Sequence, residues 1–228
     1  MQMPKIIIPV KGNEPMTAHC IASVQKYVEN PDFLIVDNLG TFGISGIPVI
    51  RGNDWGFAES CNRAANTTND DLLFLNNDIE AISDFLPPML KLLGKPVGVV
   101  GALLFYPDGR IQHAGSSYNN GNPNHPERRK AIEEVGPLHT REVEGVTFAC
   151  ALVSRECWDD LGGLDAEMYP FGYEDIDFCL RAKKAGWRVY FTPEARLIHR
   201  EHVTQGRYLS EIRKKSDISI KNLRERWS

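Results

Sequence analysis

The sequence lacks paired cysteines, a long apolar run and an excess of positive charge. Its five cysteines lie far apart, without the short spacing of a zinc site, so we expect reduced thiols in a cytosolic protein rather than a disulfide framework. No run approaches the roughly eighteen apolar residues of a membrane span. Met1-Gln2-Met3-Pro4 leads straight into an apolar strand-like run, which is not the pattern of a secretory signal.

The formal net charge is −4, so a polyanion would find no general attraction to this chain. The charge is unevenly distributed, however. Residues 206–228 carry a net charge of +4, whereas residues 1–205 carry a net charge of −8. Nucleic acid is therefore disfavoured as a partner, and a DNA-modifying transferase would have to dock through the basic segment 207–226. The 228 residues suffice for one large domain with a buried core, and they are equally consistent with one module of a longer polypeptide.

The first half alternates short apolar runs with helical patterns. The apolar runs predict strands at residues 5–10, 33–36, 47–50 and 72–75. Apolar residues at helical spacing predict helices at residues 15–29 and 56–68. This alternation favours an α/β fold with a mostly parallel sheet covered on both faces, in which ligands bind beyond the carboxyl ends of the strands. Four polar residues stand at such strand ends: Lys11, Asp37, Arg51 and Asp78.

The second half is less regular. We expect strands at residues 97–105, 110–113, 143–153 and 187–192, a long loop at 115–141, and helices at 174–185 and 206–227. The last helix carries an apolar stripe formed by Leu209, Ile212, Ser216, Ile220, Leu223 and Trp227. This stripe favours a lid packed on the core over a contact with a partner or a membrane surface.

Two acidic segments and a histidine indicate chemistry on a phosphorylated substrate. Asn76-Asn77-Asp78 follows a buried strand, and oxygen ligands of this kind suit Mg²⁺ or Mn²⁺. His199, or its neighbour His202, could supply an imidazole to the same cation.

The second acidic segment, Glu174-Asp175-Ile176-Asp177, opens a helix, where acids also stabilise the dipole. Glu174 and Asp175 are adjacent and point in different directions, so only one of them can face the site. We choose Asp175 as general base and expect Asp177 to pair with Arg181 four residues on. Aromatic side chains at 169, 171 and 173 could face an acceptor sugar or anchor the loop.

Several blocks, taken in order, resemble the family 2 glycosyltransferases with the GT-A fold, particularly their rhamnosyltransferase-like branch. The matching blocks between about residues 4 and 202 are these: 6–10, 35–38, Asp54-Trp55-Gly56-Phe57-Ala58 with Asn62, Leu75-Asn76-Asn77-Asp78, Tyr106-Pro107-Asp108-Gly109, Gln112-His113-Ala114-Gly115, Gly162-Gly163-Leu164-Asp165, 173–177, Pro193-Glu194-Ala195 and His199.

The resemblance implies a metal-assisted, inverting sugar transfer from a UDP-, dTDP- or GDP-sugar to a glycan or glycoconjugate, as in polysaccharide biosynthesis, in the cytoplasm or at its membrane surface. It implies Mg²⁺ or Mn²⁺ on Asp78 and His199, and catalytic carboxylates at Asp175, the base, and Glu174. The residues that it places around the nucleotide sugar are Pro9, Val10, Asp37, Asn38, Arg51, Gly56, Phe57, Asn62, Asn76, Asn77 and Phe148.

The resemblance also implies one domain over residues 1–205, with a nucleotide-binding half at about 1–105 and an acceptor-side half at about 106–205, followed by the amphipathic segment 206–228. Two departures from the family pattern stand out. Asn76 replaces the usual Asp, which leaves fewer charges for the cation, and Phe148 replaces a Gly, where its ring could narrow the sugar pocket. A binding domain that has lost turnover is therefore the alternative. A nucleotidyltransferase is disfavoured, because Lys11-Gly12-Asn13 is too short for the Gly-rich, basic loop of that class.

Overall fold

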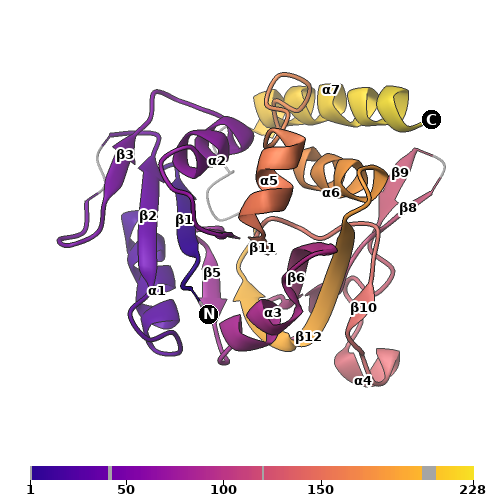
Figure 1. Ribbon diagram of the computed structural model, residues 1–228, viewed down its shortest axis with the longest axis horizontal. Coiled ribbons are helices and arrows are strands. Elements are labelled where there is room, and N and C mark those ends of the chain that lie inside the picture. Colours follow the sequence, from indigo (N-terminus) through magenta and orange to yellow (C-terminus); the bar gives the residue numbers. More distant parts are fainter. Residues whose placement is uncertain (1, 41–42, 120, 202–208) are drawn as a thin grey trace.

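The computed structural model describes residues 2–40, 43–119, 121–201 and 209–228. Its centre is a ten-stranded sheet with the order β10-β12-β6-β11-β4-β1-β2-β3, in which β5 also pairs with β12 and β7 with β6 (Figure 1). The strands of this sheet are β1 (Lys5–Val10), β2 (Asp32–Asp37), β3 (Val49–Arg51), β4 (Leu72–Leu75), β5 (Ile79–Ala81), β6 (Val97–Phe105), β7 (Ile111–His113), β10 (Arg141–Glu142), β11 (Cys150–Val153) and β12 (Arg188–His199). A separate hairpin consists of β8 (Ser117–Asn119) and β9 (Asn122–Asn124).

Helices cover both faces of the sheet. They are α1 (Glu14–Gln25), α2 (Phe57–Ala65), α3 (Leu86–Leu92), α4 (Ile132–Val135), α5 (Arg155–Leu161), α6 (Glu174–Lys184) and α7 (Leu209–Trp227). Strand β1 shows how the layers arise, because Ile6 and Ile8 pack into the core under α1 and α3, whereas Ile7 packs into the core under α2, α5 and α6. The strand alternation thus divides the apolar residues between two cores.

The pairing confirms the predicted α/β architecture. Strands β4, β1, β2 and β3 run parallel, and β12 runs parallel to β6, while β11 lies antiparallel between β4 and β6. Apart from three segments, the predicted strands and helices are present with ends shifted by a few residues, and residues 206–208 of the last predicted helix lie outside the described residues. All five cysteines are free and buried, as expected of reduced thiols.

Three predicted segments differ from the structure. The run 187–192 belongs to a longer single strand, β12, which continues to His199 and contains an irregularity between Thr192 and Arg196 where it pairs with β6. The long loop 115–141 contains the β8-β9 hairpin and α4. The strand expected at 143–153 begins only at Cys150, because residues 143–149 leave the sheet and cross the start of α6, where Gly145 is so close to Ile176 that a Cβ would clash.

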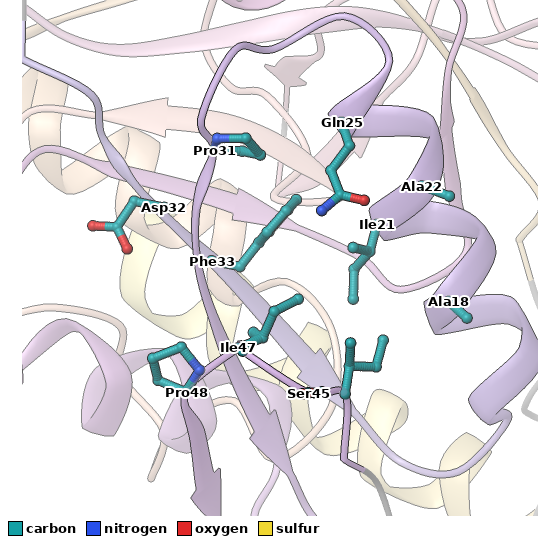
Figure 2. A pocket seen from close by; sticks show the side chains of 12 residues that line it. Ala18, Ile21, Ala22, Gln25, Pro31, Asp32, Phe33, Ser45, Ile47 and Pro48 are labelled. Atoms are coloured by element: carbon teal, nitrogen blue, oxygen red, sulfur yellow. The ribbon is translucent and has the colours of Figure 1, made fainter.

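Two pockets among the described residues lie away from the carboxyl ends of the parallel strands. One of about 400 Å³ is enclosed by α1, the start of β2 and residues 44–48 (Figure 2). A second of about 460 Å³ lies around Lys95 and the start of α5. Asp32 and Phe33 line the first pocket, and since β2 begins there and ends at Asp37, this pocket is at the opposite edge of the sheet from the predicted site.

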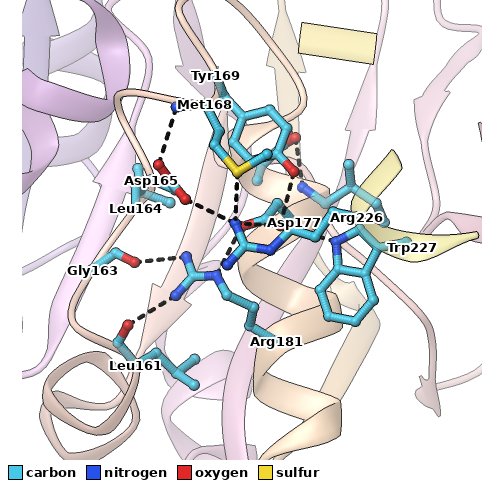
Figure 3. Close-up of polar contacts among 12 residues, drawn as sticks. Leu161, Gly163, Leu164, Asp165, Met168, Tyr169, Asp177, Arg181, Arg226 and Trp227 are labelled. Atoms are coloured by element: carbon cyan, nitrogen blue, oxygen red, sulfur yellow. Dashed lines mark hydrogen bonds and ion pairs between the residues drawn. The ribbon is translucent and has the colours of Figure 1, made fainter. Parts of the chain in front are cut away.

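Helix α7 packs on the core through a buried carboxylate (Figure 3). Asp177, fully buried on α6, accepts hydrogen bonds from Arg181 Nε at 2.8 Å, from the Tyr169 hydroxyl at 3.0 Å and from Trp227 Nε1 at 3.0 Å. Leu223 is also fully buried beside Tyr169. The predicted Asp177–Arg181 pair and the predicted lid are therefore confirmed, and Tyr169 is an anchor of this lid. Among the described residues, no helix has the length and apolar character needed to cross a membrane.

Replacing Asp177 by Ala is expected to lower the free energy of unfolding by about 3–5 kcal/mol, because Arg181 would remain as a buried charge without its partner. Denaturant titration measures this loss. The control is Asp217→Ala, an exposed aspartate on α7, which is expected to change stability by less than about 0.5 kcal/mol. Equal stability of the two variants would show that the hydrogen bonds and ion pair of Asp177 do not stabilise the packing of α7 on the core.

Candidate active site

The first part of the site is the end of β2. Asp37 is fully buried, and it accepts hydrogen bonds from Arg51 Nη1 at 2.6 Å and from the Leu39 amide at 3.1 Å. Asn38 donates to Ser60 Oγ at 2.9 Å, and its own side-chain oxygen is buried without a hydrogen-bond partner among the described residues. Parallel pairing places this point next to Val10 of β1, because the Asn38 amide donates to the Val10 carbonyl. Asp37, Asn38, Arg51 and Val10 thus lie together, as predicted.

The second part is the end of β4, where Asn76-Asn77-Asp78 meets His199. Asp78 Oδ1 lies 3.1 Å from His199 Nε2, and Asn76 Nδ2 lies 3.4 Å from the same nitrogen. Strand pairing explains this contact, since His199 of β12 is in register with Ile79 of β5. Asn77 turns away and donates to the Thr17 hydroxyl at 3.0 Å. His202, the alternative imidazole, lies outside the described residues.

The polar atoms of this second part fit a divalent cation. Asp78 Oδ1 and His199 Nδ1 are buried, and neither has a hydrogen-bond partner of acceptable geometry among the described residues. No group of three or more His, Cys, Asp or Glu side chains suited to a metal is present in that part of the chain. Asp78 and His199 would therefore provide two ligands, a number that suits Mg²⁺ or Mn²⁺ when phosphates and water supply the others.

The third part is the start of α6. Asp175 is half-buried, and its carboxylate accepts hydrogen bonds from the Ile176 amide at 2.8 Å and from the Phe148 amide at 3.4 Å. Burial raises the pKa of Asp175, and the two amides partly offset that effect. Glu174 is more deeply buried, with Oε2 unpartnered among the described groups. Burial, reinforced by the charge of Asp175, raises the pKa of Glu174 to about 8.

The buried Glu174 is expected to make the protein less stable as the pH rises. Because its pKa is raised in the folded state, the native protein holds this proton more tightly than the unfolded chain does, and the stability is lost between about pH 4.5 and about pH 8. Glu174→Gln should remove this contribution, whose slope is at most about 1.4 kcal/mol per pH unit. Denaturant midpoints across this range measure it, with the exposed Glu133→Gln as control. An unchanged slope in Glu174→Gln would contradict the prediction.

A single backbone segment joins the second and third parts. Phe148 donates its amide to Asp175, and the carbonyl of the next residue, Ala149, accepts from the Asn76 amide at 3.0 Å. The candidate base and the Asn76-Asn77-Asp78 turn therefore bond two consecutive residues, Phe148 and Ala149, which lead into β11. Asp37 stands two strands away on the same edge of the sheet, since β1 lies between β2 and β4.

Two residues predicted to touch the nucleotide sugar have other surroundings. The Phe148 ring is buried in the core, stacked on Phe74 with centroids 5.2 Å apart and edge-on to Phe178. It does not narrow the sugar pocket, which corrects that expectation. The Asn62 amide bonds to both the carbonyl and the amide of Leu164, at 2.8 and 2.9 Å, which favours a role in holding the Gly162-Gly163 turn against α2.

The remaining predicted contacts lie near the Asp37 part. Gly56 caps the start of α2, where its carbonyl accepts from the Ser60 hydroxyl at 2.8 Å, and Phe57 packs partly buried on the second core. Pro9 precedes Val10 in β1. Their contact with a donor stays a prediction.

Sequence reasoning did not single out three residues beside Asp175. Thr147 lies next to this carboxylate, His125 interacts with it electrostatically, and His113 contacts both Thr147 and His125. The block Gln112-His113-Ala114-Gly115 was the available signal for His113, because it forms part of the family resemblance.

Comparison with known proteins decides the family. The family model described as "Glycosyltransferase like family 2" matches residues 35–228. The chain belongs to this family. A relative is protein y4gI of Sinorhizobium fredii, 32% identical over 97% of this chain, and this chain spans 27% of its length. A second is the N-acetylglucosaminyl-diphospho-decaprenol L-rhamnosyltransferase of Mycobacterium tuberculosis, 25% identical over 85% of this chain and 74% of that protein.

Solved structures agree with the fold expected of this glycosyltransferase family. GalNAc-T7 with UDP, GalNAc and Mn²⁺ superposes with a TM-score of 0.68 at 13% identity, over 86% of this chain and 43% of the other. The mannosyltransferase PcManGT of Pyrobaculum calidifontis, in complex with GDP-Man and Mn²⁺, superposes with a TM-score of 0.65 at 14% identity, over 93% and 61% of the two chains. At such identities the likeness concerns the fold, and it confirms the predicted GT-A type.

Proposed function

We propose that this domain transfers a sugar from a nucleoside-diphosphate donor to a hydroxyl group of a glycan or glycoconjugate, with inversion at the anomeric carbon. The observation that carries the proposal is the position of residues 148 and 149, which bond Asp175 on one side and the Asn76-Asn77-Asp78 turn on the other. A base and a cation site so joined could act on the two faces of one sugar.

Asp175 is suited to take the acceptor proton. Burial raises the pKa of its carboxyl group, which makes it a stronger base than an exposed aspartate, and the Ile176 and Phe148 amides fix its direction. On the opposite side, Asp78 and His199 would hold Mg²⁺ or Mn²⁺, which supplies positive charge to the departing diphosphate. Asp37, with Arg51, would contact the nucleoside, because both lie at the next parallel strand ends.

The relatives support the substrate class. The mycobacterial relative is a rhamnosyltransferase named for an N-acetylglucosaminyl-diphospho-decaprenol substrate. The two similar structures hold UDP with Mn²⁺ and GDP-Man with Mn²⁺. These relatives support a nucleoside-diphosphate sugar as donor and a divalent cation as its partner in the proposed reaction.

A panel of UDP-, dTDP- and GDP-sugars tests the proposal. A true donor is expected to raise the melting temperature in the presence of Mn²⁺, and to be consumed with release of the nucleoside diphosphate. Proton NMR of the product gives the anomeric configuration, and retention would contradict the inverting mechanism. Stabilisation without donor consumption would favour the alternative that Asn76, with one charge fewer than aspartate, leaves a binding domain without turnover.

A further inference from the structure

Two histidines from separate segments meet beside the proposed base. His113 ends β7 and is buried, while His125 follows β9 and is half-buried. Their Nδ1 atoms lie 3.3 Å apart, and the ring planes meet at 67°. The other nitrogen of His113, Nε2, accepts a hydrogen bond from the Thr147 amide at 3.3 Å. The Thr147 amide and the Phe148 amide, which binds Asp175, are consecutive in the chain.

These contacts determine where the ring protons sit. An amide can only donate, so His113 Nε2 must be the unprotonated nitrogen and the proton of His113 must be on Nδ1. This Nδ1–H then donates to His125 Nδ1, which leaves the proton of His125 on Nε2. Burial lowers the pKa of both imidazoles, so the neutral forms required for this arrangement prevail.

The contact with His113 leaves the Nε2–H of His125 available to another group. In the described part of the chain, His125 Nε2 makes no hydrogen bond. The His125 ring is linked to the proposed base through His113, which contacts the Thr147 amide, and through the neighbouring Phe148 amide, which bonds Asp175. Arg128 anchors the same loop, because it donates to both carboxylate oxygens of Glu201 at 3.0 Å, two residues after His199. The loop that carries His125 is therefore also tied to the segment that follows His199.

We propose that His113 holds His125 in one tautomer, so that His125 Nε2–H donates a hydrogen bond to an oxygen of a carbohydrate acceptor next to the hydroxyl attacked. This inference rests on the proposed function and extends it to the acceptor. Hydroxyl and ring oxygens of a sugar accept such a bond. His113 is then a positioning residue and His125 a binding residue.

Two substitutions separate this role from a purely structural link between the histidines. The Asn side-chain oxygen in His125→Asn takes the place of Nδ1, so the contact with His113 is kept and the Nε2–H donor is lost. His125→Gln does the opposite, because its amide nitrogen reaches the position of Nε2. We expect His125→Asn to raise the acceptor KM about fivefold to tenfold, and His125→Gln to recover most of this loss. A structural link predicts the reverse order.

The acceptor probes are the p-nitrophenyl glycosides of glucose, N-acetylglucosamine and rhamnose. Nitrogen-15 NMR of the histidine rings, with Mg²⁺ and the nucleoside diphosphate that stabilises the protein most, reads the tautomers directly. We expect protons on His113 Nδ1 and His125 Nε2, and a shift of the His125 Nε2–H signal with at least one glycoside. The other tautomer, or no shift with any glycoside, overturns the inference.

The outcomes also separate this inference from the function on which it rests. A wild-type protein that consumes no nucleotide sugar fails the proposed function and this inference with it. A wild-type protein that consumes the donor, while His125→Asn keeps the wild-type acceptor KM, overturns the inference alone.

Discussion

Replacing Asp175 by Asn is expected to lower the turnover of sugar transfer about a hundredfold to ten-thousandfold while donor affinity stays within about twofold of wild type. The reason is that an amide keeps the size of the side chain, and its one oxygen can still accept from either the Phe148 or the Ile176 amide, but it cannot take a proton from the acceptor hydroxyl. The loss should therefore appear in kcat, and the donor site should remain intact.

Two measurements check this expectation on the same protein samples. Initial rates of nucleoside-diphosphate release give turnover, and calorimetric titration of the donor gives affinity. The exposed Asp84→Asn serves as control, because it makes the same chemical change away from the site. If donor affinity fell in parallel with turnover in Asp175→Asn, the carboxylate would belong to donor binding and another group would have to act as base.

Replacing Asp78 by Ala is expected to remove the part of nucleotide affinity that depends on a divalent cation, a loss of about tenfold to a hundredfold in Mn²⁺. In EDTA the variant and the wild type should bind the nucleoside diphosphate equally. This pattern follows from the proposed cation site, in which Asp78 Oδ1, buried 3.1 Å from His199 Nε2, would contact the nucleotide through a shared cation.

Titration of the nucleoside diphosphate with and without Mn²⁺ measures the difference. The exposed Asp108→Ala is the matched control, because it removes the same charge from a surface turn. An Asp78→Ala protein whose affinity retained its full dependence on Mn²⁺ would show that the cation is held elsewhere.

The predicted part of the site has a simple physical origin. A buried strand in a parallel sheet must be apolar throughout, so the residue at which polar side chains begin marks its end. Asp37 after residues 33–36 and Asp78 after residues 72–75 could be recognised in this way, and the structure places both on one edge. The pairing of Asp177 with Arg181 was predictable too, because residues four apart on a helix are neighbours.

The unpredicted part depends on contacts between residues that are distant in the chain. The amide of Asn62 binds Leu164, one hundred and two positions away, and the Phe148 ring packs between Phe74 and Phe178. In both cases the residue type is compatible with binding a ligand. Only the fold shows that each side chain instead contacts other residues of the protein.

The amino-acid sequence by itself determined the α/β class, the strand ends that carry the acidic residues, and the family, because each of these follows from local periodicity or from blocks of neighbouring residues. The tertiary structure alone decided which residues share the site. Strand β11 enters antiparallel between β4 and β6, and this insertion brings residues 147–149 between Asp175, Asn76 and His113. The order of the strands in the sheet arises from the packing of whole strands, and no local pattern of residues encodes it.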